Sequence, residues 1–169
     1  YLFRRKTGTN YLLILERLAI VSALTCYMIR LGNLMNSEMI GLPTNQPWGF
    51  VFSSKDSIPR HPAQLYEAIH YFISFVILYW IWSTQRVKMK DGLVTSWGLI
   101  VMFSFRFIDE FFKIDQVSFE EGMILNMGQL LSIPFILTGV GLLIFNMTQK
   151  REAISADKIE VETKEVKME

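Results

Sequence analysis

Four apolar stretches, each long enough to cross a lipid bilayer, constrain this chain more than any other feature. They run over about 11–29, 65–82, 93–112 and 127–147. A helix needs roughly 17–25 predominantly apolar residues to span the hydrocarbon core, and a backbone in lipid must satisfy its own hydrogen bonds. With 51% apolar residues and a mean hydropathy of +0.28, the sequence predicts an all-α, polytopic transmembrane helix bundle of about four spans.

The basic residues between these stretches predict the topology. They lie before the first stretch, between the second and third, and after the fourth: Arg4, Arg5, Lys6; Arg86, Lys88, Lys90; Lys150, Arg151. Because cytoplasmic loops carry an excess of Lys and Arg, we expect cytoplasmic termini and outward loops at 31–63 and 113–125. Residues 1–147 would form the membrane domain, and 148–169 a charged cytoplasmic tail.

Several classes of site have no support in the sequence. Cys26 is the only cysteine and lies inside an apolar stretch, which favours a packing role. His61 and His70 have no metal-ligand spacing with a cysteine or with each other. We therefore expect no metal, no cofactor and no nucleic-acid partner.

A first polar cluster lies where the first apolar stretch ends, at Arg30-Leu-Gly-Asn33-Leu-Met-Asn36-Ser-Glu38-Met-Ile-Gly41. Arginine donors suit phosphate oxygens, and asparagine amides suit hydroxyls. Arg30 alone could extend from a helix end toward water, but the density of polar groups favours a site. We interpret this cluster as half of a phospholipid head-group site.

A second cluster, Arg106, Asp109 and Glu110, lies within the third stretch. Residues four apart share a helix face, so Arg106 and Glu110 could form a self-neutralised pair. Alternatively, Glu110 orients Arg106 and leaves its other donors for a ligand anion. Ionisable residues inside a span usually mark a site, which favours the second interpretation, whereas Glu16 near the opposite side is interpreted as structural.

The segment Pro59-Arg-His61-Pro-Ala-Gln64-Leu-Tyr66-Glu67 precedes the second stretch. His61 could act as a general base, and an equally supported alternative is a rigid helix start with Gln64 and Glu67 in its first turns. His70, in mid-span, is more typical of an interhelical hydrogen bond.

The fourth stretch opens on Asn126-Met-Gly-Gln129. Asn126 is a plausible N-cap. Gln129 could serve either that cap or the site.

Four motifs, in this order and spacing, resemble the bacterial phosphatidylglycerol–prolipoprotein diacylglyceryl transferases. They are Arg30-Leu-Gly-Asn-Leu-Met-Asn-Ser-Glu38, Pro59 to Glu67, Phe105-Arg-Phe-Ile-Asp-Glu-Phe111 and Met127-Gly-Gln-Leu-Leu-Ser-Ile-Pro134. The resemblance implies an integral enzyme of the bacterial inner membrane that uses no metal. Such an enzyme transfers the diacylglyceryl group of phosphatidylglycerol to the lipobox cysteine thiol of a prolipoprotein signal peptide, releasing glycerol phosphate.

By resemblance, two groups of residues fall on the family's functional regions: Arg30, Asn33, Glu38 and Gly41, and then Arg106 and Glu110. Our candidate catalytic residues are Arg30, His61, Arg106 and Glu110. Our candidate substrate-binding residues are Arg30, Asn33, Asn36, Glu38, Gly41, Gln64, Tyr66, Arg106 and Gln129. Two guanidiniums could hold the lipid phosphate and stabilise the charge that develops on the leaving group, while the attacking thiol must lose its proton.

The family carries further spans and a His-Gly-Gly motif at its N-terminus, and this chain contains no such motif and begins at Tyr1. We therefore interpret it as the C-terminal part of the enzyme. Two other functions are considered. A non-enzymatic module that binds anionic phospholipid would keep Arg30 and Arg106 but need no base, and a small transporter subunit is disfavoured because no internal repeat is visible.

Overall fold

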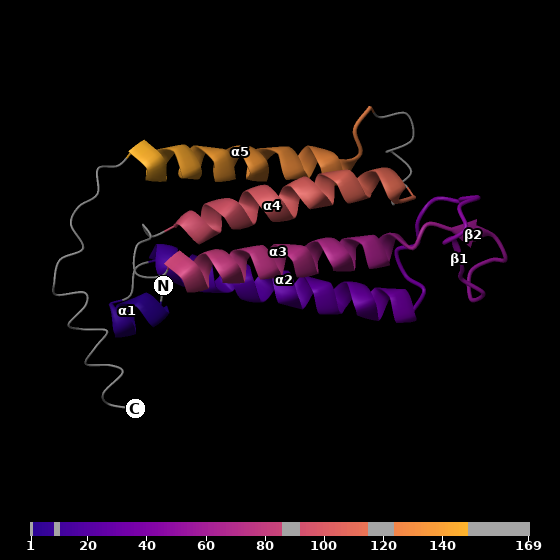
Figure 1. Ribbon diagram of the computed structural model, residues 1–169, viewed down its shortest axis with the longest axis horizontal. Coiled ribbons are helices and arrows are strands. Elements are labelled where there is room, and N and C mark those ends of the chain that lie inside the picture. Colours follow the sequence, from indigo (N-terminus) through magenta and orange to yellow (C-terminus); the bar gives the residue numbers. More distant parts are fainter. Residues whose placement is uncertain (1, 9–10, 86–91, 115–123, 149–169) are drawn as a thin grey trace.

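The computed structural model describes residues 2–8, 11–85, 92–114 and 124–148. The elements are α1 (Leu2–Thr7), α2 (Tyr11–Met35), β1 (Phe50–Val51), β2 (Pro59–Arg60), α3 (Ala63–Gln85), α4 (Leu93–Asp109), the 3-10 turn η1 (Glu110–Phe112) and α5 (Met127–Thr148). In Figure 1 the four long helices lie side by side along one axis, with the antiparallel β1–β2 pair at one end. The predicted helical membrane bundle is confirmed.

Three of the described helices, α2, α3 and α5, are long and apolar enough to cross a membrane. The 17-residue α4 lies between them and contacts all three, which is consistent with the prediction of about four spans. Since α2 begins and α5 ends at the same end of the bundle (Figure 1), the chain crosses the bundle's length an even number of times. The cytoplasmic placement of that end stays a prediction.

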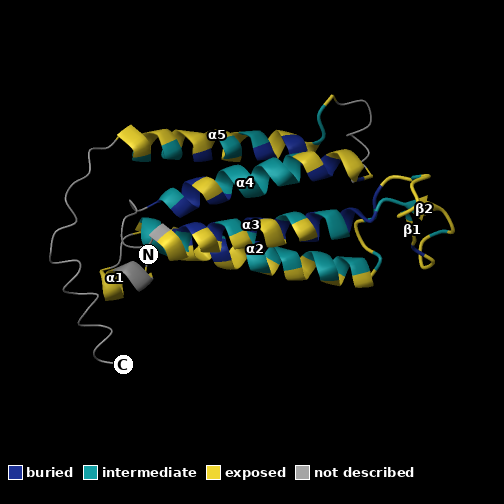
Figure 2. Cartoon of the chain, in the orientation of Figure 1, coloured by how far each residue is buried: buried dark blue, intermediate teal, exposed yellow. Residues whose placement is uncertain are grey.

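A small apolar core joins three helices in the half of the bundle away from β1 and β2. It contains Ile20 and Ala23 of α2, Leu78 and Ile81 of α3, and Val94 of α4, all of them buried. The outward faces are apolar as well, and α2 and α5 are exposed along much of their length (Figure 2). Such faces suit contact with lipid chains.

Glycines let α4 approach its neighbours closely, as expected for membrane helices. A Cβ on Gly98 would lie 3.3 Å from the Cβ of Ala19 on α2, and a Cβ on Gly139 would lie 2.9 Å from the Cβ of Leu99. A Cβ on Gly141 would enter open space. Of these three glycines, Gly98 and Gly139 therefore serve helix packing.

A buried carboxylate stabilises the start of α4. Glu16 Oε1 accepts a hydrogen bond of 2.6 Å from Gly92 N, immediately before the helix. Helix N-termini carry free N–H groups and a partial positive charge. This contact agrees with the structural role expected for Glu16.

Some element ends differ from the predicted ones. Helix α2 continues to Met35, so Arg30 and Asn33 lie on a helix, whereas the sequence predicted a loop from residue 31. Helix α4 ends at Asp109 and a 3-10 turn follows. The basic loop, the acidic loop and nearly all of the charged tail lie outside the described residues, at 86–91, 115–123 and 149–169.

Candidate functional site

Three chain segments meet through their backbones at Gly41, at the end of the bundle that holds β1 and β2. Gly41 N donates to His61 O (3.1 Å), Leu42 N donates to Phe112 O (2.9 Å), and His61 N donates to Leu42 O (2.9 Å). A Cβ on Gly41 would collide with the His61 carbonyl and lie 2.7 Å from Phe112 O. The glycine is therefore needed for close backbone approach, and this junction holds the predicted site segments together.

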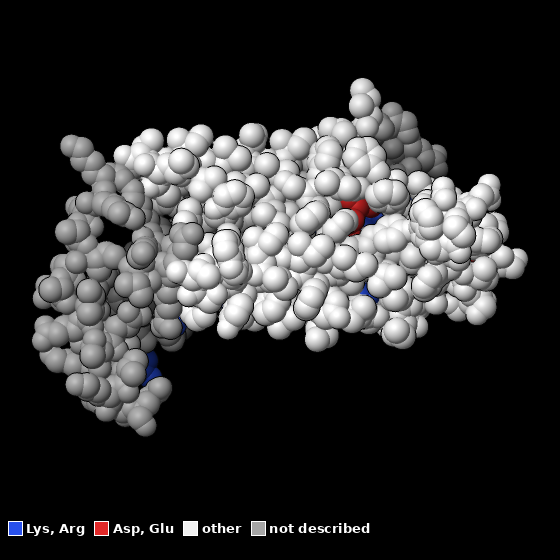
Figure 3. All heavy atoms as spheres, viewed as in Figure 1, with Lys and Arg blue, Asp and Glu red and all other residues white. Residues whose placement is uncertain are grey.

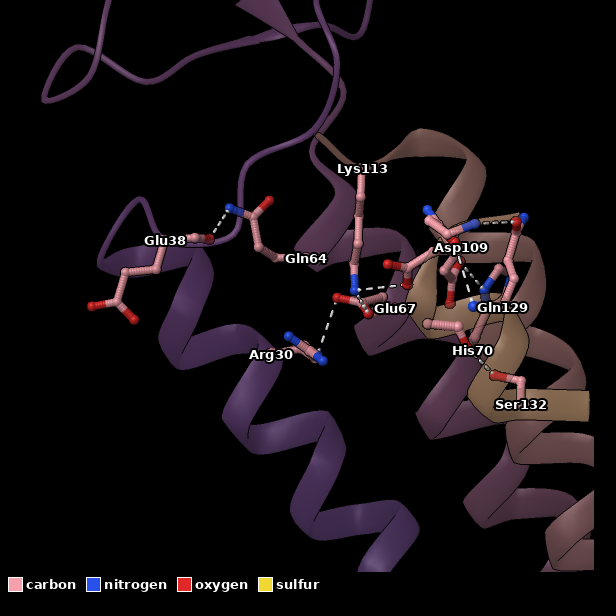
Figure 4. Close-up of polar contacts among 12 residues, drawn as sticks. Arg30, Glu38, Gln64, Glu67, His70, Asp109, Lys113, Gln129 and Ser132 are labelled. Atoms are coloured by element: carbon pink, nitrogen blue, oxygen red, sulfur yellow. Dashed lines mark hydrogen bonds and ion pairs between the residues drawn. The ribbon is translucent and has the colours of Figure 1, made fainter. Parts of the chain in front are cut away.

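A buried ion network has Glu67 at its centre (Figure 4). Glu67 Oε2 lies 3.1 Å from Arg30 Nε, and Glu67 Oε1 lies 2.7 Å from Lys113 Nζ. Lys113 Nζ also lies 3.5 Å from Glu110 Oε2. The network joins α2, α3 and η1, and only 1% of the Glu67 side chain is exposed.

The predicted Arg106–Glu110 pair is wrong. Glu110 instead faces Lys113, because a 3-10 turn brings side chains three residues apart into line. The Glu110 carboxyl also abuts the start of α5, where a Cβ on Gly128 would lie 2.6 Å from Oε2. Glu110 thus joins Lys113 to α5.

Arg106 forms no ion pair or hydrogen bond with any part of the chain that the structure describes, and it is half-buried. Arg30 uses only its Nε on Glu67. Both guanidiniums act electrostatically on the Cys26 thiol and on the Tyr71 hydroxyl. The two arginines therefore share one neighbourhood, as the sequence predicted.

Arg106 has no carboxylate partner among the described ion pairs. Arg30 and Lys113 pair with Glu67 and Glu110, and the carboxylate of Asp109 lies beside His70. A cation in a low-dielectric region is costly unless an anion pairs with it. In Figure 3, charged atoms are few on the visible face of the described bundle: a red patch with a little blue beside it and a separate blue spot lie toward the β1–β2 end, and a few blue atoms lie at the opposite end.

The other residues of the first motif surround a turn. Asn33 is half-buried at the end of α2, while Asn36 and Glu38 are exposed. The buried Gln64 donates from Nε2 to Glu38 O at 2.5 Å, and its own Oε1 has no described partner. A cavity of about 490 Å³ opens here, lined by Glu38, Lys55, Lys113 and neighbouring residues.

Gln129 serves the cap of α5. Its Oε1 accepts from Asn126 N at 3.3 Å, and its backbone N donates to Asn126 Oδ1 at 3.4 Å. This reciprocal pair satisfies two N-terminal donors, and it confirms Asn126 as the N-cap. Gln129 is buried beside Asp109 (Figure 4).

A second cavity, of about 520 Å³, includes residues from the first turns of α3. It is lined by Trp48, His61, Tyr66, His70, Phe112 and two isoleucines. The Tyr66 hydroxyl accepts from Trp48 Nε1 at 2.9 Å and lies 3.2 Å from His61 Nδ1. Its walls are mainly apolar, which suits a lipid chain or an apolar peptide side chain.

His70 lines the same cavity from α3 and contacts α4. Its Nδ1 lies 2.7 Å from Asp109 Oδ1, and its ring stacks on Phe105 with centroids 4.4 Å apart and planes inclined by 5°. The expected interhelical hydrogen bond is confirmed. Its partner, Asp109, is 3% exposed at the side chain.

Glu67 and Lys113 were not among the predicted site residues. Both are buried charges, and a carboxylate inside a span needs a cationic partner. Glu67 could therefore have been identified as a site residue. The identity of its two partners depends on how α2, α3 and η1 pack.

The amino-acid sequence is similar to those of known proteins. The family model described as prolipoprotein diacylglyceryl transferase matches residues 1–145. The chain is similar to proteins named phosphatidylglycerol–prolipoprotein diacylglyceryl transferase in Bacteroides fragilis (46% identity; 86% of this chain, 52% of the relative), Tolumonas auensis (44%; 89% and 58%) and Chloroherpeton thalassium (42%; 82% and 52%). It spans about half the length of the curated relatives it matches.

Proposed function

Because the chain belongs to the prolipoprotein diacylglyceryl transferase family, we propose that the protein transfers the diacylglyceryl group of phosphatidylglycerol to the lipobox cysteine thiol of a prolipoprotein. Phosphatidylglycerol and prolipoprotein appear in the names of its relatives. The signal peptide carrying the lipobox would be the part that enters the site. The reaction would release glycerol phosphate.

The observation that carries this proposal is that the guanidinium of Arg106 has no ion-pair partner among the described residues. It lies on a helix of the membrane bundle, shares a neighbourhood with Arg30, and has no described carboxylate partner. A guanidinium keeps its charge in low dielectric and offers a planar fork that fits two phosphate oxygens. A phospholipid phosphate would pair with the guanidinium of Arg106.

The remaining groups have roles that follow from their contacts. Glu67 holds Arg30 by Nε, so the terminal nitrogens of Arg30 stay available for the phosphate. As the thiol attacks the glyceryl carbon, the C–O bond breaks and negative charge develops on the leaving phosphate. Preorganised cations stabilise such charge, and Lys55 and Lys113 in the cavity of about 490 Å³ would bind the departing glycerol phosphate.

Asn33, Asn36, Glu38, Gln64, Tyr66 and Gln129 stay in the proposal as substrate-binding residues, and Glu110 and His61 as residues of the catalytic region. The buried Oε1 of Gln64, without a described partner, suits a glycerol hydroxyl, because a buried acceptor left unpaired is costly. We place the protein in the bacterial inner membrane with cytoplasmic termini, as the basic loops favour. The arginine site would then face outward.

Arg106→Lys in the full-length protein tests the proposal. The substitution keeps the charge but replaces a planar guanidinium, which can bind two phosphate oxygens, by a single ammonium group. We therefore expect at least about a hundredfold loss of transfer. The assay follows diacylglyceryl transfer from phosphatidylglycerol to a lipobox peptide thiol. Arg17→Lys, near the opposite end of α2, is the matched control and should retain activity.

Two results would refute the proposal in different ways. Full transfer by Arg106→Lys would show that the guanidinium of Arg106 is not needed to bind the lipid phosphate. Binding of phosphatidylglycerol by the wild-type protein without any thioether product would favour the non-enzymatic lipid-binding module.

A further inference from the structure

We infer that His70, held by Asp109, accepts the proton of the attacking thiol, and that the cavity of about 520 Å³ that His70 lines receives this thiol. The inference rests on the proposed transfer function. The sequence alone favoured an interhelical hydrogen bond for His70 and offered His61 as the base.

Two contacts fix the His70 ring. Asp109 Oδ1 lies 2.7 Å from Nδ1, and the Phe105 ring stacks against one face of the imidazole. A carboxylate at Nδ1 selects the tautomer with the hydrogen on Nδ1 and stabilises the cation formed after proton uptake. The ring is therefore oriented as a histidine base requires.

The other ring nitrogen is available. With Nδ1–H donated to Asp109, Nε2 carries a lone pair, and among the described residues no partner occupies it. The side chain remains 25% exposed and lines the cavity. An acceptor in an apolar-walled cavity is what a thiol needs before it can attack as a thiolate.

His61 lines the same cavity but differs in its partner. Its Nδ1 lies 3.2 Å from the Tyr66 hydroxyl, which already accepts from Trp48. A neutral hydroxyl stabilises an imidazolium less than a carboxylate does. The geometry therefore favours His70 over His61 as the base.

The titratable groups around the His70–Asp109 pair come from the ion network and from the cavity of about 520 Å³. Asp109 interacts electrostatically with Glu67 of α3 and with Lys113 after η1, as well as with His70. The cavity adds the titratable side chains of His61 and Tyr66. The His70–Asp109 pair thus adjoins the ion network that holds Arg30.

The proton and electron balance needs no further reactant. The thiol S–H bond breaks and its proton moves to His70 Nε2. The sulfur lone pair forms the C–S bond as the C–O bond of phosphatidylglycerol breaks, and the electron pair of that bond leaves on the phosphate oxygen. His70 then returns the proton to the released glycerol phosphate or to water.

His70→Gln in the full-length protein, supplied with phosphatidylglycerol and a lipobox peptide, tests this role. We expect transfer at pH 7 to fall by about 10²–10⁴, the usual contribution of a general base. The difference in rate from the wild type should shrink as the pH approaches about 8.5, the ordinary pKa of a cysteine thiol, because a thiolate needs no base. In His70→Gly, added imidazole should restore part of the rate.

Three further variants separate a base from a structural contact. Asp109→Asn should lower the rate through loss of the ring's orientation and give the same pH dependence, which keeps the test valid if His70→Gln fails to fold. His61→Gln should lower the rate without changing the shape of the pH profile. Thr84→Ala, on the exposed far end of α3, should match the wild type.

Two results would overturn the inference. One is a pH profile of His70→Gln equal to that of the wild type. The other is a loss of rate that is the same at every pH in His70→Gln and is not restored by imidazole in His70→Gly. If Arg106→Lys is inactive in the same assay, the proposed function survives that result. No transfer by the wild-type protein would refute the proposed function itself.

Discussion

Glu67→Gln should destabilise the bundle more than any other single loss of charge in the described residues. Glu67 is the carboxylate shared by two cations, Arg30 Nε at 3.1 Å and Lys113 Nζ at 2.7 Å. Glutamine keeps the shape and removes the charge. Arg30, whose side chain is 13% exposed, then loses its described carboxylate partner, and the buried Lys113 retains only Glu110 at 3.5 Å.

The magnitude follows from these distances. With an effective dielectric constant of about 20, Coulomb's law gives attractions of about 5 and about 6 kcal/mol for 3.1 and 2.7 Å. Desolvation of the three groups offsets much of this attraction. Removal of one partner from a buried pair typically costs about 3–5 kcal/mol, and we expect Glu67→Gln to fall in this range.

Equilibrium unfolding of the full-length protein in mixed micelles measures this cost. Glu38→Gln is the matched control, because its side chain is exposed and such changes stay within about 0.5 kcal/mol. A double-mutant cycle with Lys113→Met should give a coupling energy of about 2–3 kcal/mol. A loss equal to that of the control, or a coupling near zero, would show that the network does not hold α2, α3 and η1 together.

Three other substitutions test neighbouring features. Gly41→Ala should separate the backbones that meet there, at a cost of about 1–3 kcal/mol, and increase amide hydrogen exchange at the junction. Gly128→Ala places a Cβ 2.6 Å from Glu110 Oε2 and should lower the unfolding temperature, unlike Gly141→Ala, whose Cβ enters open space. The hydrogen bond from Arg60 lowers the pKa of Asp56 below its usual 3.8, so this contact stabilises the β1–β2 loop at neutral pH and is lost as the pH falls below that value. The protection of the loop amides from hydrogen exchange, relative to their intrinsic exchange rates, should therefore fall in acid for the wild type; Asp56→Asn should show lower protection at neutral pH, and the difference should disappear in acid.

Hydropathy and length were sufficient to predict the helices, because lipid leaves the backbone few alternatives. The ends were harder to predict. The polar side chains from Arg30 onward suggested a loop, yet Arg, Leu and Met are good helix formers, and no proline occurs before Pro43. Helix α2 therefore continues to Met35.

The site was predicted in its composition and only partly in its contacts. The sequence places Arg106 and Glu110 on one helix, but the 3-10 turn after Asp109 directs Glu110 to Lys113. Likewise, the sequence shows two ionisable residues inside spans, at 70 and 109, without showing that they face each other. Partner choice among several charges depends on how helices pack, and spacing along one helix contains no such information.

The backbone junction at Gly41 also sets an order of events during biogenesis. Leu42 hydrogen-bonds to Phe112, which is synthesised only after α3 and α4, so the loop after α2 must wait at the membrane surface until α4 has been inserted. Lys113 reaches Glu67 at the same stage. Until then the carboxylate of Glu67 in the nascent chain has only Arg30 as its cation. An insertion intermediate that stops after α3 would therefore expose an incomplete charge cluster, which is the kind of feature that membrane quality control can recognise.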